Sequence, residues 1–443
     1  MNQTILFSPV GGTDPISWNN GKDGSMLHIC RCYKPDRVIL YLSKEMLDFQ
    51  EQDDRYRYCL HRLEELQGHS MQIEECKRPE LVNVQDFDWF YHDFREILME
   101  ITKTMDSSDR LLLNVSSGTP AMKSCLQVLA NLGEIRCTAI QVSTPTRKIN
   151  NHTRDGYDVQ LAWETDDDNQ ERFENRCSEI HSPSLIRLKQ EEIIKRLIRE
   201  YDYRAAALVA DSVIDGSAER YRRLLTLAED RMTLNLSEAN VIDKEENFNC
   251  ISIKKSGDEV LFEYALALDV RIRKGEYADF ARALSPLIVA LFENILDNRY
   301  HIDVEQYIRT DGKGVRKWTG RKLIGTETLD VLNSSYSASF NADDYVKSDH
   351  FVKLIHYYGA EDQSLVSLVD TIRDIEGNVR NKAAHEMVMV TDDNIKRYTG
   401  YHAAEIMEML KRLFKYSSVK VEPEDWDSYD RMNAKIIEKV VAP

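Results

Sequence analysis

The chain has 443 residues, of which 42% are hydrophobic and 30% charged, values of an ordinary globular protein that exclude wholesale disorder. This length exceeds what one hydrophobic core usually serves, so it predicts two domains. The 58 Lys and Arg and 75 Asp and Glu give a formal net charge of -17, which disfavours tight, sequence-reading binding to duplex DNA. A groove with a few local cations could still grip RNA transiently.

The first residues and the cysteines indicate the compartment. The chain begins Met-Asn-Gln and passes directly into a strand-like run, without the basic and apolar regions of a signal peptide. No stretch approaches the roughly 20 apolar residues that span a bilayer. The eight cysteines lack disulfide-framework spacing, and Cys30 and Cys32 lack a second pair to complete a zinc site, so they are interpreted as small buried side chains. We expect a cytoplasmic protein with no membrane association, no metal and no cofactor.

Residues 2 to 144 alternate short apolar runs with amphipathic segments, which is typical of a mostly parallel sheet flanked by helices. The apolar runs are 4–7, 38–42, 111–115 and 135–142. Helical patterns cover 44–66, 86–105 and 120–132, and the last begins with Thr119 as N-cap and Pro120 at the first position. We therefore expect a Rossmann-like α/β domain over residues 1–180. The acidic stretch Asp166-Asp167-Asp168 is interpreted as a solvated loop or edge hairpin.

From Ser182-Pro183 onward, helical spacing of apolar residues dominates. The helical patterns recur over 203–233, 258–298, 350–358, 362–387 and 392–415. This predicts a mainly α-helical domain over residues 181–443, in which 181–255 could form a linking helical subdomain. Residues 300–350 are less clearly patterned, and there Arg316, Lys317 and Trp318 are expected to cap a loop rather than to line an RNA path.

Two loops in the first domain have unusual compositions. The first apolar run is followed by Ser8-Pro9-Val10-Gly11-Gly12-Thr13-Asp14, and the run 111–115 is followed by Ser116-Ser117-Gly118-Thr119-Pro120, with Lys123 one turn into the next helix. In an open α/β sheet, ligands bind beyond the carboxyl ends of the strands. Small residues let the backbone approach a ligand, amides at a helix start favour phosphate, and hydroxyl groups add donors. The loops either bind a phosphate-rich small molecule or simply close tight turns.

Neither loop matches the three-glycine dinucleotide fingerprint or a phosphate loop ending in Gly-Lys-Ser or Gly-Lys-Thr, which disfavours redox cofactors and NTP hydrolysis. The predicted ligand-binding residues are Gly11, Gly12, Thr13, Asp14, Trp18, Asn114, Ser116, Ser117, Gly118, Thr119 and Lys123.

The C-terminal half carries the hexapeptide 380–385, Arg-Asn-Lys-Ala-Ala-His. Four apolar residues before it share one helix face and should face the core: Leu368, Ile372, Ile375 and Val379. At about 100° per residue, Arg380 and His385 flank the opposite direction, with Asn381 and Ala384 between them. An imidazole can act as general acid or base, and a guanidinium can hold a phosphate, which is what RNA cleavage by its own 2′-hydroxyl requires. By spacing alone, an exposed Arg and His are more often just solvated.

A Rossmann-like domain with a Ser-Gly-Thr-Pro loop, joined to a helical domain with Arg380-Asn381-x-x-x-His385, resembles the CARF-HEPN ribonucleases of type III CRISPR systems. The resemblance covers nearly the whole chain. It implies a homodimer that binds cyclic oligoadenylate across its N-terminal domains, hexa-adenylate in preference to tetra-adenylate, and cuts single-stranded RNA in a composite site of its HEPN-type helical domains. Arg380 and His385 match the catalytic pair and Asn381 the auxiliary polar position, while Lys382 is a neighbour that could touch RNA.

Six of the loop residues match ligand-loop positions of this family: Gly11, Gly12, Thr13, Ser117, Gly118 and Thr119. The resemblance also implies that His385 acts as general acid or base and Arg380 on the scissile phosphate, leaving a 2′,3′-cyclic phosphate without a divalent metal. It implies a functional link to the type III effector complex without stable binding to it. Some relatives cleave their own activator in the N-terminal domain, and the sequence does not show whether this chain does.

Two other functions compete with this hypothesis. In the first, the chain is a non-catalytic regulator that senses a nucleotide with one domain and binds another protein with the other, and Arg380 and His385 are ordinary surface residues. The second, a metal-dependent phosphodiesterase, is disfavoured because His69, His92 and His152 are isolated in the sequence.

Overall fold

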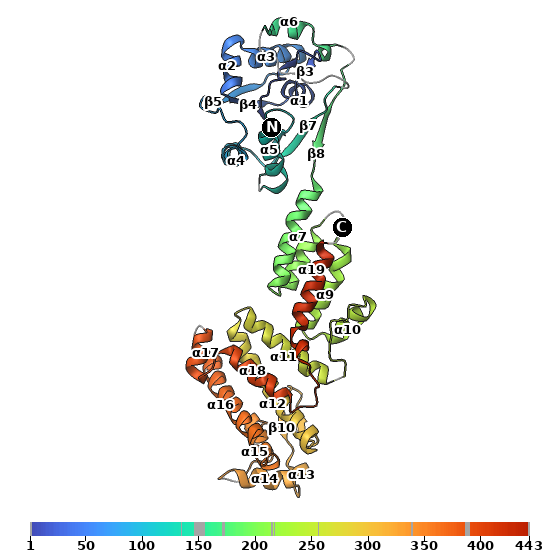
Figure 1. The fold of residues 1–443 in the computed structure, drawn as a ribbon, viewed down its shortest axis with the longest axis vertical. Helices are drawn as coiled ribbons and strands as arrows, with labels where there is room; N and C mark the ends of the chain where they lie inside the picture. Colours follow the sequence, from blue (N-terminus) through green and yellow to red (C-terminus); the bar gives the residue numbers. More distant parts are fainter. Residues whose placement is uncertain are drawn as a thin grey trace. The chain divides into compact units, whose positions relative to one another are not determined.

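The computed structural model describes residues 2–133, 135–145, 156–170, 173–213, 216, 218–255, 257–337, 340–385 and 390–441; for residues 380–385 it describes the backbone but not the side chains. The chain divides into two compact units, Met1–Lys189 and Gln190–Pro443 (Figure 1).

The first unit is built on a six-stranded sheet in the order β5-β4-β1-β6-β7-β8. Its strands are β1 (Thr4–Pro9), β4 (Arg37–Ser43), β5 (Gln72–Arg78), β6 (Arg110–Asn114), β7 (Thr138–Val142) and β8 (Cys177–Ile180), and a separate short hairpin pairs β2 (Ile16–Ser17) with β3 (Lys22–Asp23). All neighbouring strands of the large sheet run parallel except β8, which is antiparallel to β7. The predicted mostly parallel sheet is therefore confirmed.

Helices cover both faces of this sheet. They are α1 (Ser25–Tyr33), α2 (Lys44–Asp53), α3 (Arg55–Gln67), α4 (Phe87–Lys103), α5 (Pro120–Leu132) and α6 (Val159–Glu164). In β1, Leu6 packs with residues of α1 and α3, whereas Ile5 and Phe7 pack with residues of α4 and α5. Figure 1 shows α4 and α5 on the side of the sheet opposite α3 and α6. Because side chains alternate along a strand, a strand covered on both faces must be apolar throughout, which explains the continuous apolar runs.

Two sequence predictions for this unit need correction. The helix expected over 44–66 is two helices, because Asp54 between them has φ 50° and breaks the first. Asp166 and Asp168 are not solvated, since each is only 2% exposed. Arg31 of α1 lies near Asp166, and Arg176 donates a hydrogen bond of 2.9 Å to Asp168. These cations, distant in the sequence, neutralise the carboxylates and permit their burial; only Asp167 is exposed.

The second unit is helical and has one continuous hydrophobic core, which confirms the predicted α-helical C-terminal half. The helices of its first part are α7 (Pro183–Arg199), α8 (Tyr203–Asp211), α9 (Glu219–Met232), α10 (Leu236–Glu245), α11 (Asp258–Arg273) and α12 (Tyr277–Tyr300). Those of its second part are α13 (Gly320–Leu323), α14 (Glu327–Ser335), α15 (Ser348–Tyr358), α16 (Gln363–His385), α17 (Asp392–Thr399), α18 (Ala403–Phe414) and α19 (Ser428–Val441). The long helix α12 packs against α11, α15 and α16.

Residues 300–350, poorly patterned in the sequence, contain a small hairpin of β9 (Ile308–Thr310) and β10 (Arg316–Trp318). Trp318 is fully buried, and its indole N–H donates to Nδ1 of His350 at 2.9 Å. Arg316 pairs with Glu293 at 2.7 Å. The expectation that Trp318 caps a loop was therefore wrong, because this indole is part of the core.

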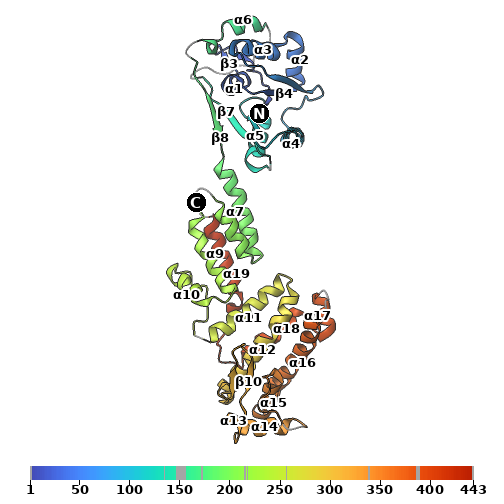
Figure 2. The same cartoon turned by 180° about the vertical axis from the view of Figure 1, so that it is seen from behind.

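The C-terminal helix α19 packs against α9, although the two helices are far apart in the sequence (Figure 2). Arg231 of α9 is fully buried and donates two hydrogen bonds to Glu263 of α11, at 2.8 and 3.1 Å, and one of 3.0 Å to Ser428 of α19. Its guanidinium also lies 4.3 Å from the ring centre of Tyr429. A buried charge is tolerated only when it is paired in this way, so Arg231 joins three helices at one point.

Candidate functional site

A cavity of about 570 Å³ opens at the carboxyl edge of the parallel strands, where sequence analysis placed a ligand site. It lies among the loops that follow β1, β4 and β6. Its lining comprises Val10, Gly11, Gly12, Thr13, Ser43, Lys44, Glu45, Met46, Asp48, Leu81, Val82, Val84, Ser116, Ser117, Gly118, Thr119, Pro120, Met122 and Lys123. The structure thus brings both glycine- and serine-rich loops to one hollow surface.

Eight of the eleven predicted ligand residues line this cavity: Gly11, Gly12, Thr13, Ser116, Ser117, Gly118, Thr119 and Lys123. The other three, Asp14, Asn114 and Trp18, are not part of its described lining. Trp18 lies on the surface, 49% exposed, with its ring edge-on to Tyr157 at 6.3 Å.

The two loops touch each other at their glycines. A Cβ atom on Gly11 would lie 2.9 Å from the backbone nitrogen of Gly118 and 2.9 Å from Oγ of Ser117. Gly118 itself has φ +87°, a left-handed conformation that side chains rarely adopt, and a Cβ there would meet Met122. Glycine is required at both positions for the loops to approach this closely.

Asp14 is hydrogen-bonded to lining residues of the cavity and holds the two loops together. Its carboxylate accepts hydrogen bonds from the backbone N–H groups of Gly11 and Met26, both at 3.0 Å, and from the hydroxyl of Ser117. Burial raises the pKa of Asp14, although these three hydrogen bonds act in the opposite direction. Asp14 therefore holds two residues of the cavity lining, Gly11 and Ser117, in place.

Asn114 supports the same loops from the end of β6. It is fully buried, and its side-chain amide donates to the hydroxyl groups of Ser8 at 2.9 Å and Ser25 at 3.1 Å. Its side-chain oxygen accepts the backbone N–H of Ser116 at 3.0 Å. Asn114 thereby connects the carboxyl end of β1, the start of α1 and the loop after β6.

The N-terminus of α5 opens onto the cavity. Thr119 is its N-cap, with Oγ1 accepting the backbone N–H of Met122 at 3.4 Å and donating to the carbonyl of Val84 at 2.7 Å, and Pro120 is the first helical residue, as predicted. The amides of a first helical turn and the positive end of the helix dipole favour an anion. Lys123, half-buried in the next turn, adds a positive charge.

Sequence analysis missed the part of the cavity that comes from β4 and α2. Ser43, Lys44, Glu45 and Asp48 line it, together with apolar residues of the segment after β5. This part of the cavity could have been predicted, because β4 is parallel to β1 and the carboxyl ends of both strands must lie at the same edge of the sheet. Lys44 and Lys123 provide cations, while Glu45 and Asp48 provide carboxylates, so the surface has mixed charge.

The hexapeptide 380–385 forms the last turns of α16. Leu368, Ile372, Ile375 and Val379 are at most 8% exposed, which confirms the predicted apolar stripe. The predicted catalytic side chains of Arg380, Asn381 and His385 lie outside the described side chains, so their orientation stays a prediction from helical phase.

One turn before the hexapeptide, Glu376 is 2% exposed and accepts a hydrogen bond from Ser348 at the start of α15. Arg373 also donates to this carboxylate, at 3.2 Å. These contacts fix α16 against α15 just before the motif begins.

Comparison with known proteins identifies the family. Three family models match successive segments: the Cas_Csm6 CARF domain at residues 74–177, the CRISPR-associated protein Csm6 6H domain at 180–232, and the Cas_Csm6 HEPN domain at 250–437. The chain is 32% identical to the CRISPR system endoribonuclease Csm6 of Mycobacterium tuberculosis (strain ATCC 25618 / H37Rv) over 442 residues, 98% of each chain. The chain belongs to the Csm6 family.

Other Csm6 proteins show the same relationship. The chain is 34% identical to the CRISPR system endoribonuclease Csm6 of Enterococcus italicus over 230 residues, 50% of this chain and 51% of that one. It is 23% identical to Csm6' of Streptococcus thermophilus over 441 residues, 98% of this chain and 99% of the relative. A solved structure, Enterococcus italicus Csm6 bound to cyclic hexa-2'-fluoro-hexa-dAMP, has the same fold, with a TM-score of 0.67 and 21% identity over 99% of this chain and 100% of that one.

Membership in the Csm6 family confirms the predicted resemblance and enzyme class: the chain is a CRISPR endoribonuclease with a CARF domain and a HEPN domain. The hexapeptide lies inside the HEPN match, and the loop 116–119 inside the CARF match. Within the described part of the chain, no helix is long and apolar enough to cross a membrane.

Proposed function

We propose that this Csm6-family chain is a single-stranded RNA endoribonuclease that is switched on by a cyclic oligoadenylate bound in the cavity at the sheet edge. The cavity itself carries the proposal, because both predicted ligand loops and the N-terminus of α5 converge on it. Cyclic oligoadenylate presents phosphates, which suit the helix-start amides and the hydroxyl groups, and adenines, which suit the apolar wall. The Enterococcus italicus relative, which has the same fold, was solved with a cyclic hexa-adenylate analogue, and we propose hexa-adenylate over tetra-adenylate as the activator.

The proposed nuclease residues are Arg380, Asn381 and His385. His385 transfers the proton as general acid or base, Arg380 stabilises charge on the scissile phosphate, and Asn381 assists as the neighbouring polar group. Attack by the RNA 2′-hydroxyl leaves a 2′,3′-cyclic phosphate and needs no divalent metal. Two copies of the chain pair to form one composite site, so the active species is a homodimer.

The proposed division of labour assigns residues 1–180 to a Rossmann-like sensing domain and 181–443 to the helical nuclease domain, with 181–255 as the linking helical part. The protein acts in the cytoplasm, downstream of the type III effector complex and without a stable complex with it. Cleavage of the activator by the sensing domain would limit the response in time.

Labelled single-stranded RNA, incubated with the protein in EDTA with and without cyclic hexa-adenylate or tetra-adenylate, tests the nuclease proposal. We expect cutting only with an activator, stronger with hexa-adenylate, and products that end in a cyclic phosphate. Cutting that ignores both activators would refute the allosteric role. Absence of cutting, with the activator still bound, would favour a non-catalytic regulator. Chromatography of the incubated activator shows whether it is itself cleaved.

Matched variants assign the residues. His385→Ala should abolish cutting and leave activator binding unchanged, whereas His356→Ala, at a half-buried histidine of α15 that pairs with Asp370, should keep full activity. Lys123→Ala should weaken activator binding, whereas Lys103→Ala, at an exposed lysine of α4, should not. Light scattering with activator present should give the mass of two chains, and a monomer would contradict the composite site.

A further inference from the structure

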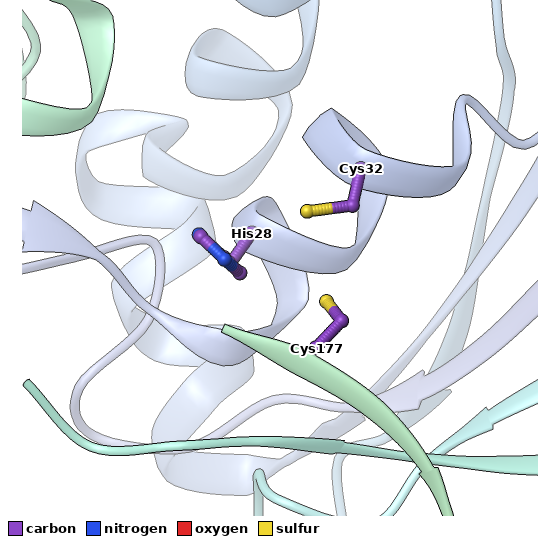
Figure 3. A group of neighbouring side chains, drawn as sticks. All are labelled: His28, Cys32 and Cys177. Carbon is purple, nitrogen blue, oxygen red and sulfur yellow. The ribbon is translucent and has the colours of Figure 1, made fainter. Parts of the chain in front are cut away.

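A histidine and two cysteines converge in the first unit, away from the described lining of the oligoadenylate cavity. His28 and Cys32 lie four residues apart on α1 and therefore on one helix face, and Cys177 is the first residue of β8 (Figure 3). The ligand atoms of the three side chains all lie within 4.8 Å of one another. His28 is buried, and the two cysteines, both free thiols, are half-buried.

This donor set is the one that zinc prefers. Two thiolates and one imidazole, with a water in the fourth position, form a recurrent tetrahedral zinc site with Zn–S about 2.3 Å and Zn–N about 2.0–2.1 Å. These bond lengths place the ligand atoms of a tetrahedral site roughly 3.4–3.8 Å apart. The observed ligand atoms lie within 4.8 Å of one another, so closing the site requires them to approach by up to about 1–1.4 Å. Figure 3 shows both sulfur atoms on the same side of the His28 ring.

The surroundings of His28 fit a metal ligand. Its Nδ1 faces the carboxylates of Asp23 at 3.4 Å and Asp168 at 3.6 Å, and Nη2 of Arg176 lies 3.1 Å from it. Metal-binding histidines usually give their other ring N–H to a carboxylate, which fixes the ring and raises its basicity. Its Nε2 accepts the backbone N–H of Arg176 at 3.0 Å, so Nε2 carries the lone pair that binds metal. A metal ion would replace this hydrogen bond and the one that the thiol of Cys32 donates to the side-chain oxygen of Asn175 at 3.2 Å.

The neighbouring carboxylates are already neutralised and do not compete as ligands. Arg31 donates to both oxygens of Asp23, at 2.6 and 2.9 Å, and Arg176 donates to Asp168 at 2.9 Å. These arginines would repel a cation placed among the aspartates. Two thiolates cancel the charge of a divalent ion, so the cysteine side of His28 accommodates it without adding net charge to the buried network.

We propose that His28, Cys32 and Cys177 bind one zinc ion that fastens β8 to α1. β8 is a four-residue edge strand with no fully buried side chain, held by its pairing with β7 and by the ion pair between Glu179 and Arg110 of β6. A metal bound at Cys177 secures this strand at its first residue. The site contains none of the proposed nuclease residues, so the role we propose for zinc is to hold β8 against α1 rather than to cut RNA.

The test uses the full-length protein, purified under reducing conditions and loaded with Zn²⁺ or Co²⁺. We expect about one metal ion per chain and, with Co²⁺, the charge-transfer absorption of cobalt bound to thiolate. Cys32→Ser and Cys177→Ser should each lose this absorption and weaken zinc affinity at least about tenfold. Cys76→Ser, at a half-buried cysteine of β5 outside the group, should keep both.

Thiol labelling provides a second readout that needs no variant. Zinc should slow alkylation of Cys32 and Cys177 in the wild-type protein and leave Cys76 unchanged. The proposal would be overturned if the wild type bound no metal, or if both serine variants bound zinc as tightly as the wild type. Alkylation of Cys32 and Cys177 that zinc does not slow would also overturn it. A disulfide between Cys32 and Cys177 in protein whose thiols were blocked at lysis would also overturn it, in favour of a redox pair.

Discussion

Replacing Asp14 with Asn tests whether a buried carboxylate shapes the activator cavity. Asp14 accepts hydrogen bonds from Gly11, Met26 and Ser117. Asn keeps one acceptor oxygen, but its NH₂ group faces donors, so at least one charge-assisted hydrogen bond, worth about 1.5–3 kcal/mol, is lost and one buried N–H is left unpaired at about 1–3 kcal/mol. Together these losses amount to about 2.5–6 kcal/mol. Burial raises the pKa of Asp14, which makes its charge less costly to remove, so we expect a loss toward the lower end of this range, about 3 kcal/mol.

Thermal unfolding of the first unit should then occur about 6–12 °C lower. If half of this free energy is needed to hold the two loops in place, cyclic hexa-adenylate should bind at least about tenfold more weakly. Calorimetry measures both quantities on the same sample.

Asp109 provides a matched control at the opposite edge of the sheet. It is also buried and accepts two backbone N–H groups, those of Gln3 and Asp106, both at 2.8 Å, just before β6. Asp109→Asn should therefore destabilise the first unit without weakening activator binding. If Asp14→Asn binds the activator as the wild type does, or if both variants lose affinity equally, then Asp14 has no specific role in shaping the cavity.

Three further outcomes follow from the packing. Gly11→Ala places a Cβ 2.9 Å from the backbone of Gly118, so it should separate the loops and weaken activator binding about tenfold by calorimetry, and unchanged affinity would contradict the close contact. Arg231→Met leaves Glu263 buried without its partner, so the free energy of unfolding in urea should fall by about 3–5 kcal/mol. The double variant Arg231→Met with Glu263→Leu should recover most of this loss. Equal losses in the single and double variants would refute the pairing argument. Burial lowers the pKa of His350 from 6.5 to about 4. The unfolded chain therefore binds a proton at a higher pH than the folded protein, and the free energy of unfolding should fall by up to about 3 kcal/mol between pH 6.5 and 4. His350→Gln should flatten this dependence, and an equally steep pH profile in that variant would exclude His350 as its source.

The elements that the sequence predicted well carry their own local signals. α5 begins and ends where the cap Thr119, the proline and the apolar periodicity indicated. α1 and β5 were not predicted, because their sequences lack such local signals. α1 is capped by Gly24 without a side-chain hydrogen bond, and β5 is an edge strand without a buried side chain and so without an apolar run.

The candidate site was predictable only in part. Parallel strands bring their carboxyl ends to one edge, so the two loops could be placed together from the sequence alone. Which side chains turn toward the cavity depends on long-range partners. Asp14 turns inward because Ser117, 103 residues away, donates to it, and Asp168 is buried because Arg31 and Arg176 surround it. The sequence around a residue does not indicate partners that are distant in the chain.

The position of α19 has a consequence for how the protein is made. Ser428 and Asn433 of this last helix complete contacts with Arg231 and Tyr203 in the first helices of the second unit. A ribosome that adds about 5–20 residues per second needs roughly 10–40 s to synthesise the chain between these partners. During that interval the buried guanidinium of Arg231 lacks part of its final surroundings. The second unit therefore completes its core only after α19 has been synthesised, and a chain that stops short of α19 should be less stable.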